Sequence, residues 1–446
     1  MQTEELKILL ALEPLWTVSI NGREFLPLKS ADIELRDSAI RFGKYARRIT
    51  DVEWLRPNIF RIQARPKFRA QPDTFIFYPG DRLPSNADLR RRRRAFQQDV
   101  ARALSADRQL LHSDKRHGIG GAYPRFLMGS RAAIAVDPEE SSTVVNGIMR
   151  AAVQWSPIVK KRISVVVPEN RRHTIVCRLK GLPNLRTAFE WLQWNGEAAE
   201  PLNFDVPEPQ TRIQSYYRPN ASSEVARLCG LAPDHLQAIP NIAGKAISVR
   251  FRGLEIASVT DQETTYPMGV PLENVMSELL EKRRFGSRHP LARAHEERWL
   301  ESNLMRSIRK TLPWADPDHV YPQVPSFIGE DRNIVDLLTI TERGRLVVIE
   351  VKVSADPDLP FQAFDYWLAV ERHRKAGDFE TYGYFKGIKI RSEPALLVVV
   401  APLLAFHRTF DRLTALFPDE TELMQIGIHQ AWKREIKILR RKGLLG

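Results

Sequence analysis

The sequence predicts a mixed α/β protein built from several domains. Its 446 residues suggest about three domains, and a hydrophobic fraction of 43% is enough to build their cores. The first eighty or so residues alternate apolar and polar side chains between turn signals, as β-strands do. From about residue 131 onward, strand-like apolar runs alternate with segments of helical periodicity, which is typical of α/β domains.

Residues 1–125 are predicted to form a β-rich N-terminal region. The segment 16–26 places an Asn-Gly pair between two alternating runs, which is the strongest short signal for a β-hairpin in the chain. Further strand-like runs follow at 33–42, 59–64 and 74–78. This region therefore reads as a sheet that is followed by one helix.

That helix is predicted over residues 88–104, where apolar side chains recur at helical spacing. It contains five consecutive arginines: Arg90, Arg91, Arg92, Arg93 and Arg94. Five residues span more than one helical turn, so they cannot share one face. Two interpretations stay open: contact with nucleic-acid phosphates, or a solvated helix face whose aliphatic stems cover apolar neighbours.

Two further segments precede the C-terminal part. Residues 126–205 are predicted to form a small α/β domain, with strands at 132–136 and 163–167 around a helix. Residues 206–285 are predicted to be a connecting segment, rich in proline at first. It then contains a strand pair or bulged strand near Gly253 and an amphipathic helix over 272–280.

Charge and cysteine content bound the environment and the partners. The net charge is +13 and the isoelectric point is near 9.7. This favours a polyanionic partner, most simply nucleic acid, although a generally basic proteome would give the same balance. Cys177 and Cys229 match no metal spacing and indicate a reduced, cytoplasmic protein. No run of eighteen apolar residues predicts a membrane span.

The stretch 333–352 carries charge where a buried strand should be apolar. Two apolar runs flank a short polar connection with Gly344, which predicts a hairpin. Asp336 lies in the first run, and Glu350 and Lys352 lie on one face of the second. Unpaired buried charge costs several kcal/mol, roughly, so these residues need partners or a function. Two carboxylates on adjacent strands, within about 5–6 Å, can share Mg²⁺ through their oxygens.

This pattern resembles the PD-(D/E)XK nuclease superfamily. Asp336 matches its first motif residue and Glu350-Val351-Lys352 matches its E-x-K, while Val335 replaces the usual proline. A helix is predicted over residues 291–312, and its acidic part around 295–302 precedes these motifs. The segment 361–367 looks like the superfamily's Q-x-x-x-Y element. The likeness covers about residues 290–445, within a predicted domain of residues 286–446. It is closest to the branch of the archaeal mismatch-type endonucleases.

The resemblance implies a three-layer restriction-endonuclease-like core with a mixed sheet, in the order αβββαβα(ββ). It implies a metal-dependent endonuclease that hydrolyses DNA, in repair or in defence against foreign DNA. By this likeness Mg²⁺ or Mn²⁺ is held by Asp336, Glu350 and the carbonyl group of Val351. Glu301 is then available to a second ion, and Lys352 positions the water or stabilises charge on the phosphate.

The helices flanking the hairpin carry the remaining candidates. Glu301 is the first choice for the helix acid and Glu297 the second; both lie on one face, where the helix dipole alone would also favour acids. Gln362 is expected to orient Lys352 or to contact the nucleic-acid backbone. Tyr366 is expected to contact nucleic acid, whereas its neighbour Trp367 is expected to pack in the core.

Two alternatives accompany this interpretation. The charged trio could be a structural ion pair across two strands. The protein could also be a nucleic-acid-binding module that keeps a nuclease-like fold without cleavage. DNA is favoured over RNA as the partner, and a homodimer is compatible with the sequence. Strandedness, cut-site specificity and the number of metal ions are left open.

Overall fold

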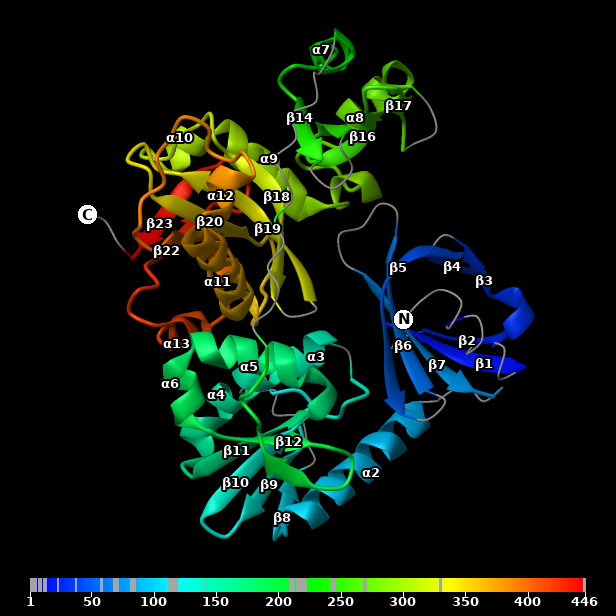
Figure 1. The fold of residues 1–446 in the computed structure, drawn as a ribbon. Coiled ribbons are helices and arrows are strands. Elements are labelled where there is room, and N and C mark those ends of the chain that lie inside the picture. Colours follow the sequence, from blue (N-terminus) through cyan, green and yellow to red (C-terminus); the bar gives the residue numbers. More distant parts are fainter. Residues whose placement is uncertain are drawn as a thin grey trace. The chain divides into compact units, whose positions relative to one another are not determined.

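The protein is mixed α/β (Figure 1). The computed structural model describes the chain in the following ranges: 6, 10, 14–21, 24–36, 38–56, 59–66, 72–80, 86–110, 119–140, 142–207, 213, 223–241, 246–267, 271–328 and 331–443. Four sheets run through these residues. The chain divides into two compact units. The first joins Met1–Arg172 to Phe189–Phe204, and the second joins His173–Ala188 to Asp205–Gly446.

The first unit begins with a seven-stranded antiparallel sheet in the order β2-β1-β7-β6-β5-β4-β3. Its strands are β1 (Leu15–Ile20), β2 (Glu24–Lys29), β3 (Glu34–Arg36), β4 (Ala39–Phe42), β5 (Tyr45–Arg56), β6 (Ile59–Pro66) and β7 (Asp73–Pro79). The predicted first hairpin is confirmed, because β1 pairs with β2 and Asn21 has a φ of 52°. Trp16, Phe60 and Phe77 pack edge-on or stacked in its core.

The single strand predicted over 33–42 is wrong. The segment forms a second hairpin, β3–β4, with Arg36 paired to Ala39. Ser38 has a φ of 60°, a left-handed conformation that extended strands do not contain. The long strand β5 was not predicted; it alternates partly buried and exposed residues, and its register shifts twice against β6.

Helix α2 (Asn86–Ala103) carries the arginine run and leads to a six-stranded sheet in the order β13-β12-β11-β10-β9-β8. These strands are β8 (Arg108–Leu110), β9 (Arg125–Met128), β10 (Arg131–Ala135), β11 (Arg162–Pro168), β12 (Glu190–Trp194) and β13 (Ala199–Pro201). The central three are parallel. Helices α3 (Ser142–Asn146) and α4 (Ile148–Val159) connect β10 to β11, and α5 (Arg172–Gly181) and α6 (Pro183–Ala188) connect β11 to β12.

The second unit contains a small antiparallel sheet built from β14 (Leu236–Asn241), β15 (Ala246–Phe251), β16 (Leu254–Val259) and β17 (Thr264–Thr265). Helices α7 (Ser223–Gly230) and α8 (Met276–Lys282) accompany it. The predicted strand pair around Gly253 is confirmed. At Gly253 φ is +80°, and a Cβ atom there would lie 2.2 Å from the backbone oxygen of Arg298. The β15–β16 turn therefore presses directly on a neighbouring helix backbone.

The C-terminal sheet has six strands in sequence order: β18 (Tyr321–Ile328), β19 (Asp331–Ile340), β20 (Leu346–Val351), β21 (Leu396–Pro402), β22 (Leu423–Ile428) and β23 (Ile438–Lys442). It is mixed, since β20, β21 and β22 are parallel and the other pairs are antiparallel. Its helices are α9 (Glu296–Arg306), α10 (Ile308–Thr311), α11 (Leu359–Ala376), α12 (Asp378–Thr381) and α13 (Phe410–Thr414).

Helices lie on both faces of this sheet. Leu300 and Leu304 of α9 share a core cluster with alternate residues of β20, Val347, Ile349 and Val351, which point to one face. Helix α11 contacts β18, β19, β20 and β21 without joining that cluster, so it covers the other face.

The helix predicted over 291–312 is shorter than expected. A 3-10 turn occupies Pro290–Ala292, and His295 has a φ of 49°, so the α-helical conformation begins only at Glu296. Ser307 separates α9 from α10. Within the part of the chain that the structure describes, no helix has the length and apolar character needed to cross a membrane.

Candidate functional site

The two acids of the central hairpin meet where β19 and β20 separate. The last register pair of the two strands at that end is Leu337 with Ile349, and continuing it would place Asp336 opposite Glu350. Residues directly opposite in an antiparallel pair share a face. The ladder stops there, and the backbone N–H of Val351 donates instead to Asp336 Oδ2 at 2.9 Å. Where β19 and β20 separate, the two carboxyls therefore face the same point.

The carboxyls of Asp336 and Glu350 lie close enough to influence each other, while both oxygens of Glu350 are buried without a hydrogen-bond partner. Burial raises the pKa of both, and the charge of Asp336 raises the pKa of Glu350 further. Glu350 is 0% exposed. Repulsion between two carboxylates in such a buried place favours the uptake of positive charge by this pair.

Lys352 supplies the cation of the site. Its Nζ lies 3.2 Å from Glu350 Oε1 and 3.6 Å from Glu297 Oε1. Burial alone would lower the pKa of Lys352, but the carboxylates of Glu350, Asp336 and Glu297 raise it well above its ordinary value. Lys352 is therefore a fixed positive charge at neutral pH.

Helix α9 brings both candidate helix acids to the site. Burial raises the pKa of Glu297, which contacts Lys352. Glu301 lies one turn further and is only 3% exposed. Burial raises its pKa to about 8, and the nearby charge of Asp336 adds to that shift while Arg298 and Arg250 oppose it.

Two residues that act on Glu301 were not found from the sequence: Gln323 acts through a hydrogen bond and Arg250 through its charge. Gln323 Nε2 donates to Glu301 Oε2 at 2.8 Å from a position in β18 with a φ of 56°. The prolines on either side in Tyr-Pro-Gln-Val-Pro are the only local hint of an irregular strand. Arg250 comes from β15, opposite Gln237, whose amide donates to the Ser302 carbonyl at 3.2 Å. No local motif indicates that this small sheet would reach the site.

Helix α11 places its candidates differently. The amide of Gln362 donates to Asp356 Oδ2 at 3.3 Å, so its hydrogen bond goes to an acid rather than to Lys352. Tyr366 lies beside the acids: burial and the charges of Glu350 and Asp336 raise the pKa of its phenol well above the usual value. Trp367 is buried and donates to the Ala395 carbonyl at 2.7 Å, which confirms its core role.

The donor groups of the acidic site are of the kind that a hard metal ion binds. Among the described residues, no group of three or more His, Cys, Asp or Glu side chains is arranged to hold a metal. Asp336, Glu350 and the Val351 carbonyl offer oxygen donors only, and Mg²⁺ is commonly bound by one or two carboxylates with waters completing its shell. The donor chemistry therefore fits a hard divalent cation, without a preformed cage.

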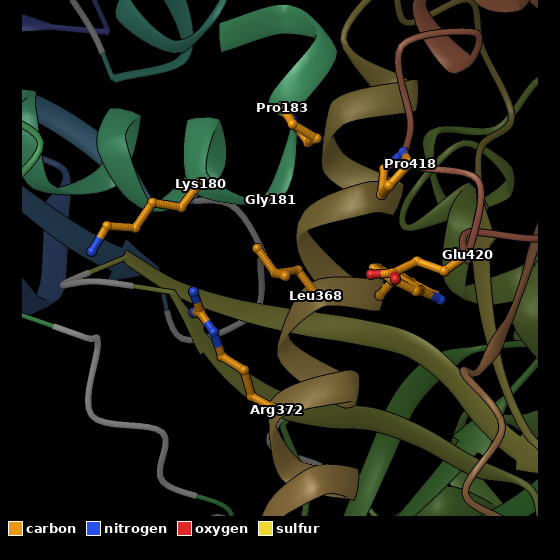
Figure 2. A pocket seen from close by; sticks show the side chains of 8 residues that line it. Lys180, Gly181, Pro183, Leu368, Arg372, Pro418 and Glu420 are labelled. Atoms are coloured by element: carbon orange, nitrogen blue, oxygen red, sulfur yellow. The ribbon is translucent and has the colours of Figure 1, made fainter.

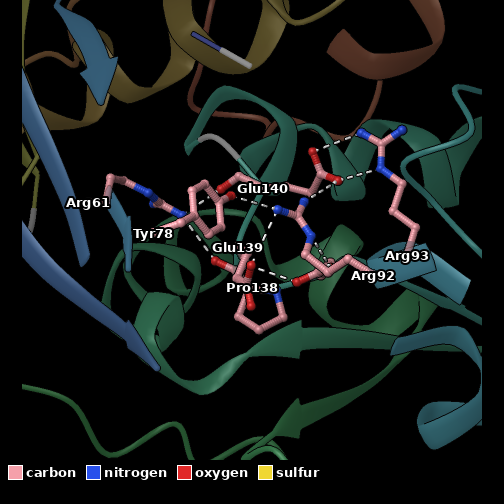
Figure 3. Close-up of polar contacts among 8 residues, drawn as sticks. Arg61, Tyr78, Arg92, Arg93, Pro138, Glu139 and Glu140 are labelled. Atoms are coloured by element: carbon pink, nitrogen blue, oxygen red, sulfur yellow. Dashed lines mark hydrogen bonds and ion pairs between the residues drawn. The ribbon is translucent and has the colours of Figure 1, made fainter. Parts of the chain in front are cut away.

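Two arginines of the run, Arg92 and Arg93, make contacts that match neither interpretation of the sequence. Arg92 lies 3.3 Å from each of three carboxylates, Asp137, Glu139 and Glu140, and donates to the Tyr78 hydroxyl at 3.1 Å (Figure 3). Its side chain is 14% exposed. The contacts of Arg92 therefore stabilise the fold of the first unit.

The other arginines of the run differ from one another in their contacts. Arg93 Nε donates to Glu140 Oε1 at 2.7 Å, and the Glu140 carbonyl accepts from Arg61 at 2.6 Å (Figure 3). Arg94 is exposed, and its contact with phosphate stays a prediction. The side chains of Arg90 and Arg91 lie outside the described residues.

A separate cavity of about 370 Å³ lies elsewhere in the second unit (Figure 2). Lys180, Leu368, Arg372 and Glu420 are among the residues that line it. It contains none of the predicted site residues.

Comparisons of the chain with protein-family models, with curated sequences and with solved structures give no match. Function therefore has to be inferred from the geometry and charge of the acidic site itself.

Proposed function

We propose that the C-terminal domain, about residues 286–446, is a PD-(D/E)XK-type nuclease with a restriction-endonuclease-like core, and that the protein is a Mg²⁺- or Mn²⁺-dependent endonuclease acting on DNA. The observed order of elements, with a helix before three strands and a mixed sheet between helices, supports the core assignment. Work in DNA repair or in defence against foreign DNA would suit such an activity.

The observation that carries the proposal is an excess of acid around one lysine, in which Glu350 is fully buried and the side chain of Glu297 is 39% exposed. Asp336, Glu350 and Glu297 surround the single ammonium group of Lys352. Burial raises the pKa of each of these acids. A structural ion pair is most favourable when its charges balance, because leftover buried charge costs several kcal/mol, roughly. This arrangement is instead suited to taking up positive charge from outside.

The residues of the chain have distinct roles in this proposal. Asp336, Glu350 and the Val351 carbonyl would hold the cation, with Glu301 available to a second one. A bound divalent cation supplies two effects, polarising the phosphate and lowering the pKa of a water ligand. Lys352 stays charged at neutral pH and sits where it can orient the attacking water or meet the charge that develops on the phosphate.

The surrounding residues keep this geometry in place. Gln323 fixes one oxygen of Glu301, and the Val351 N–H fixes one oxygen of Asp336. Glu297 restrains Lys352. Tyr366 borders the acids and is proposed to contact the nucleic-acid backbone. Hydrolysis of a phosphodiester needs a barrier reduction on the order of 20 kcal/mol, so such positioning matters for every group.

A cleavage assay tests the proposal. Purified protein should cut a panel of duplex, mismatched, branched and single-stranded DNA when Mg²⁺ or Mn²⁺ is added, and Glu350→Ala should reduce the rate by about 10³-fold or more. Glu342→Ala, at an exposed position, is the control. Cleavage by Glu350→Ala at the wild-type rate would refute the site. DNA binding without any cleavage by the wild type would favour a binding module.

A further inference from the structure

The register of the C-terminal sheet defines which segments border the acidic site. Strands β20, β21 and β22 are parallel, so their carboxyl ends lie at the same edge of the sheet. The strands end at Val351, which Lys352 follows, at Pro402 and at Ile428, and we call this the site edge. The chain that leaves β22 at Ile428 therefore emerges beside the acids.

That chain is strongly basic. Residues 429–443 contain six lysines and arginines and one glutamate. We call these six the basic rim: Lys433, Arg434, Lys437, Arg440, Arg441 and Lys442. The first half of the segment is the turn between β22 and β23, and the second half is the edge strand β23 itself.

The turn is attached to the helix that carries the site acids. Trp432 packs edge-on against Trp299 of α9, with ring centroids 6.1 Å apart. Asn303 of α9 donates to the Trp432 carbonyl at 3.0 Å, and Lys433 pairs with Glu296 at the start of the same helix. The turn is thus fixed next to Glu297 rather than merely near it in the topology.

The register also fixes β23 against the site. Arg440 is paired with Gly427, and Gly427 with Ala401. Val351 is paired with Val400, so the next residue, Lys352, lies level with Ala401. Arg440 and Lys352 are therefore at the same level of the sheet and on the same face, three strands apart, or about 14 Å at the usual strand spacing.

Among the described residues, only some side chains of the basic rim pair with a carboxylate. Lys433 and Lys442 pair with Glu296 and Asp411. Arg434 and Arg440 are exposed, and among the described residues no carboxylate pairs with either. Lys437 is 66% exposed and only 3.6 Å from an exposed glutamate, a pair worth little in water.

A simpler explanation covers only part of the rim. Charged side chains on an edge strand prevent pairing with other sheets, and that accounts for the cations of β23. It does not account for Arg434 and Lys437, which lie in the turn before the strand. Their position at the site edge points to a ligand shared with the acids.

We propose that Arg434, Lys437 and Arg440 bind the phosphates of the nucleic-acid strand that lies across the acidic site. This inference rests on the proposed endonuclease function and adds the surface that holds the substrate. Fixed cations beside the carboxylates would also offset the repulsion between the acids and an approaching polyanion.

Salt dependence of binding tests this surface. DNA binding by the whole chain is measured in EDTA by fluorescence anisotropy between 50 and 200 mM salt, with a duplex and a single-stranded oligonucleotide. Each lost phosphate contact lowers the slope of log K against log salt by about 0.9 on duplex and about 0.7 on single strands. The triple variant Arg434→Gln, Lys437→Gln, Arg440→Gln should therefore lower the duplex slope by about 2–3.

The matched control removes the same charge from the opposite edge of the sheet. Arg343, Lys386 and Lys389 are exposed, and the turn at Gly344 approaches the Lys389 carbonyl there. Changing these three to glutamine should leave the slope nearly unchanged. Melting temperatures of both triple variants should match the wild type, since all six side chains are exposed.

The outcomes separate the two proposals. Equal slope losses in both triple variants, or none in either, would overturn the basic rim as a nucleic-acid surface. The proposal would also be overturned if the rim variant lost binding to phosphatidylserine vesicles while its DNA binding stayed intact. A slope loss confined to the rim variant would support the surface even if the wild type never cleaves DNA, in which case the endonuclease proposal alone would fail.

Discussion

Two clusters of buried charge, one in each compact unit, show how differently the same residue types can be used. The cluster around Arg92 in the first unit is balanced, whereas the cluster around Lys352 in the second is not. Both were visible in the sequence as conspicuous charge, the first as a run of arginines and the second as acids within an apolar hairpin.

The cluster in the first unit matches each acid with a base. It contains four carboxylates and four guanidinium groups, linked by ion pairs: Glu53, Asp137, Glu139, Glu140, Arg61, Arg92, Arg93 and Arg171. Arg61 is fully buried and also donates to backbone carbonyls at Pro138 and Glu140. These contacts tie β6, α2 and the loop after β10 together.

The cluster in the second unit has four acids, Glu297, Glu301, Asp336 and Glu350, and only three cations near them, Lys352, Arg250 and Arg298. Burial raises the pKa of all four acids. A balanced network can satisfy itself, while an unbalanced one depends on protons or on a ligand. We therefore propose that charge balance, rather than the number of charges, distinguishes a cluster that stabilises the fold from one that has the proposed chemical role.

The largest expected effect on stability comes from disrupting the balanced cluster. Arg92→Met leaves Asp137, Glu139 and Glu140 without their shared cation and should lower the free energy of unfolding by about 3 kcal/mol. Denaturant unfolding measures it. The control is Arg94→Met, two residues along the same helix and exposed, which should change stability by less than about 0.5 kcal/mol. Equal losses of stability at the two positions would show that the contacts of Arg92 with these three carboxylates do not stabilise the fold.

A smaller, pH-dependent effect on stability tests the unbalanced cluster. The pKa of Glu301 is raised from 4.5 to about 8. Its protonated form is therefore favoured by folding; this contribution is complete below pH 4.5 and is lost as pH rises toward 8. Glu301→Gln should thus be as stable as the wild type near pH 4.5 and more stable by about 1–3 kcal/mol at pH 8.

Unfolding measured across pH 4.5–8.5 checks this, with Glu342→Gln, which removes an exposed acid, as the reference. A constant difference between Glu301→Gln and the wild type across that range would mean that folding does not raise the pKa of Glu301.

The smallest expected effect has an unusual sign. Asp336→Asn keeps an oxygen for the Val351 N–H but removes one charge from the repelling acids, so the melting temperature should stay unchanged or rise by a few degrees. Cleavage should nevertheless be lost. The comparison variant is Asp365→Asn, whose carboxylate is held by Arg178 at 2.9 Å in the same unit and which should be destabilised. A loss of stability at Asp336 as large as at Asp365 would identify a structural ion pair.

The sequence by itself determined the local elements and the identity of the acids. The Asn-Gly turn predicted the first hairpin, and the apolar runs around Gly344 predicted the hairpin that carries Asp336 and Glu350. Hydrophobic periodicity is set by neighbours a few residues apart, so such elements can be predicted without knowing the fold. The spacing of Glu297 and Glu301 likewise placed both on one helical face.

Only the tertiary structure decided which charges meet. No pattern near Arg92 in the sequence predicts its contacts with Asp137, Glu139 and Glu140. Likewise, no pattern near Glu301 predicts that Gln323 and Arg250 lie beside it. Gln362 likewise turned to Asp356 instead of Lys352. Coulomb energies and desolvation depend on distance and burial in space, and these are fixed by the packing of segments far apart in the chain.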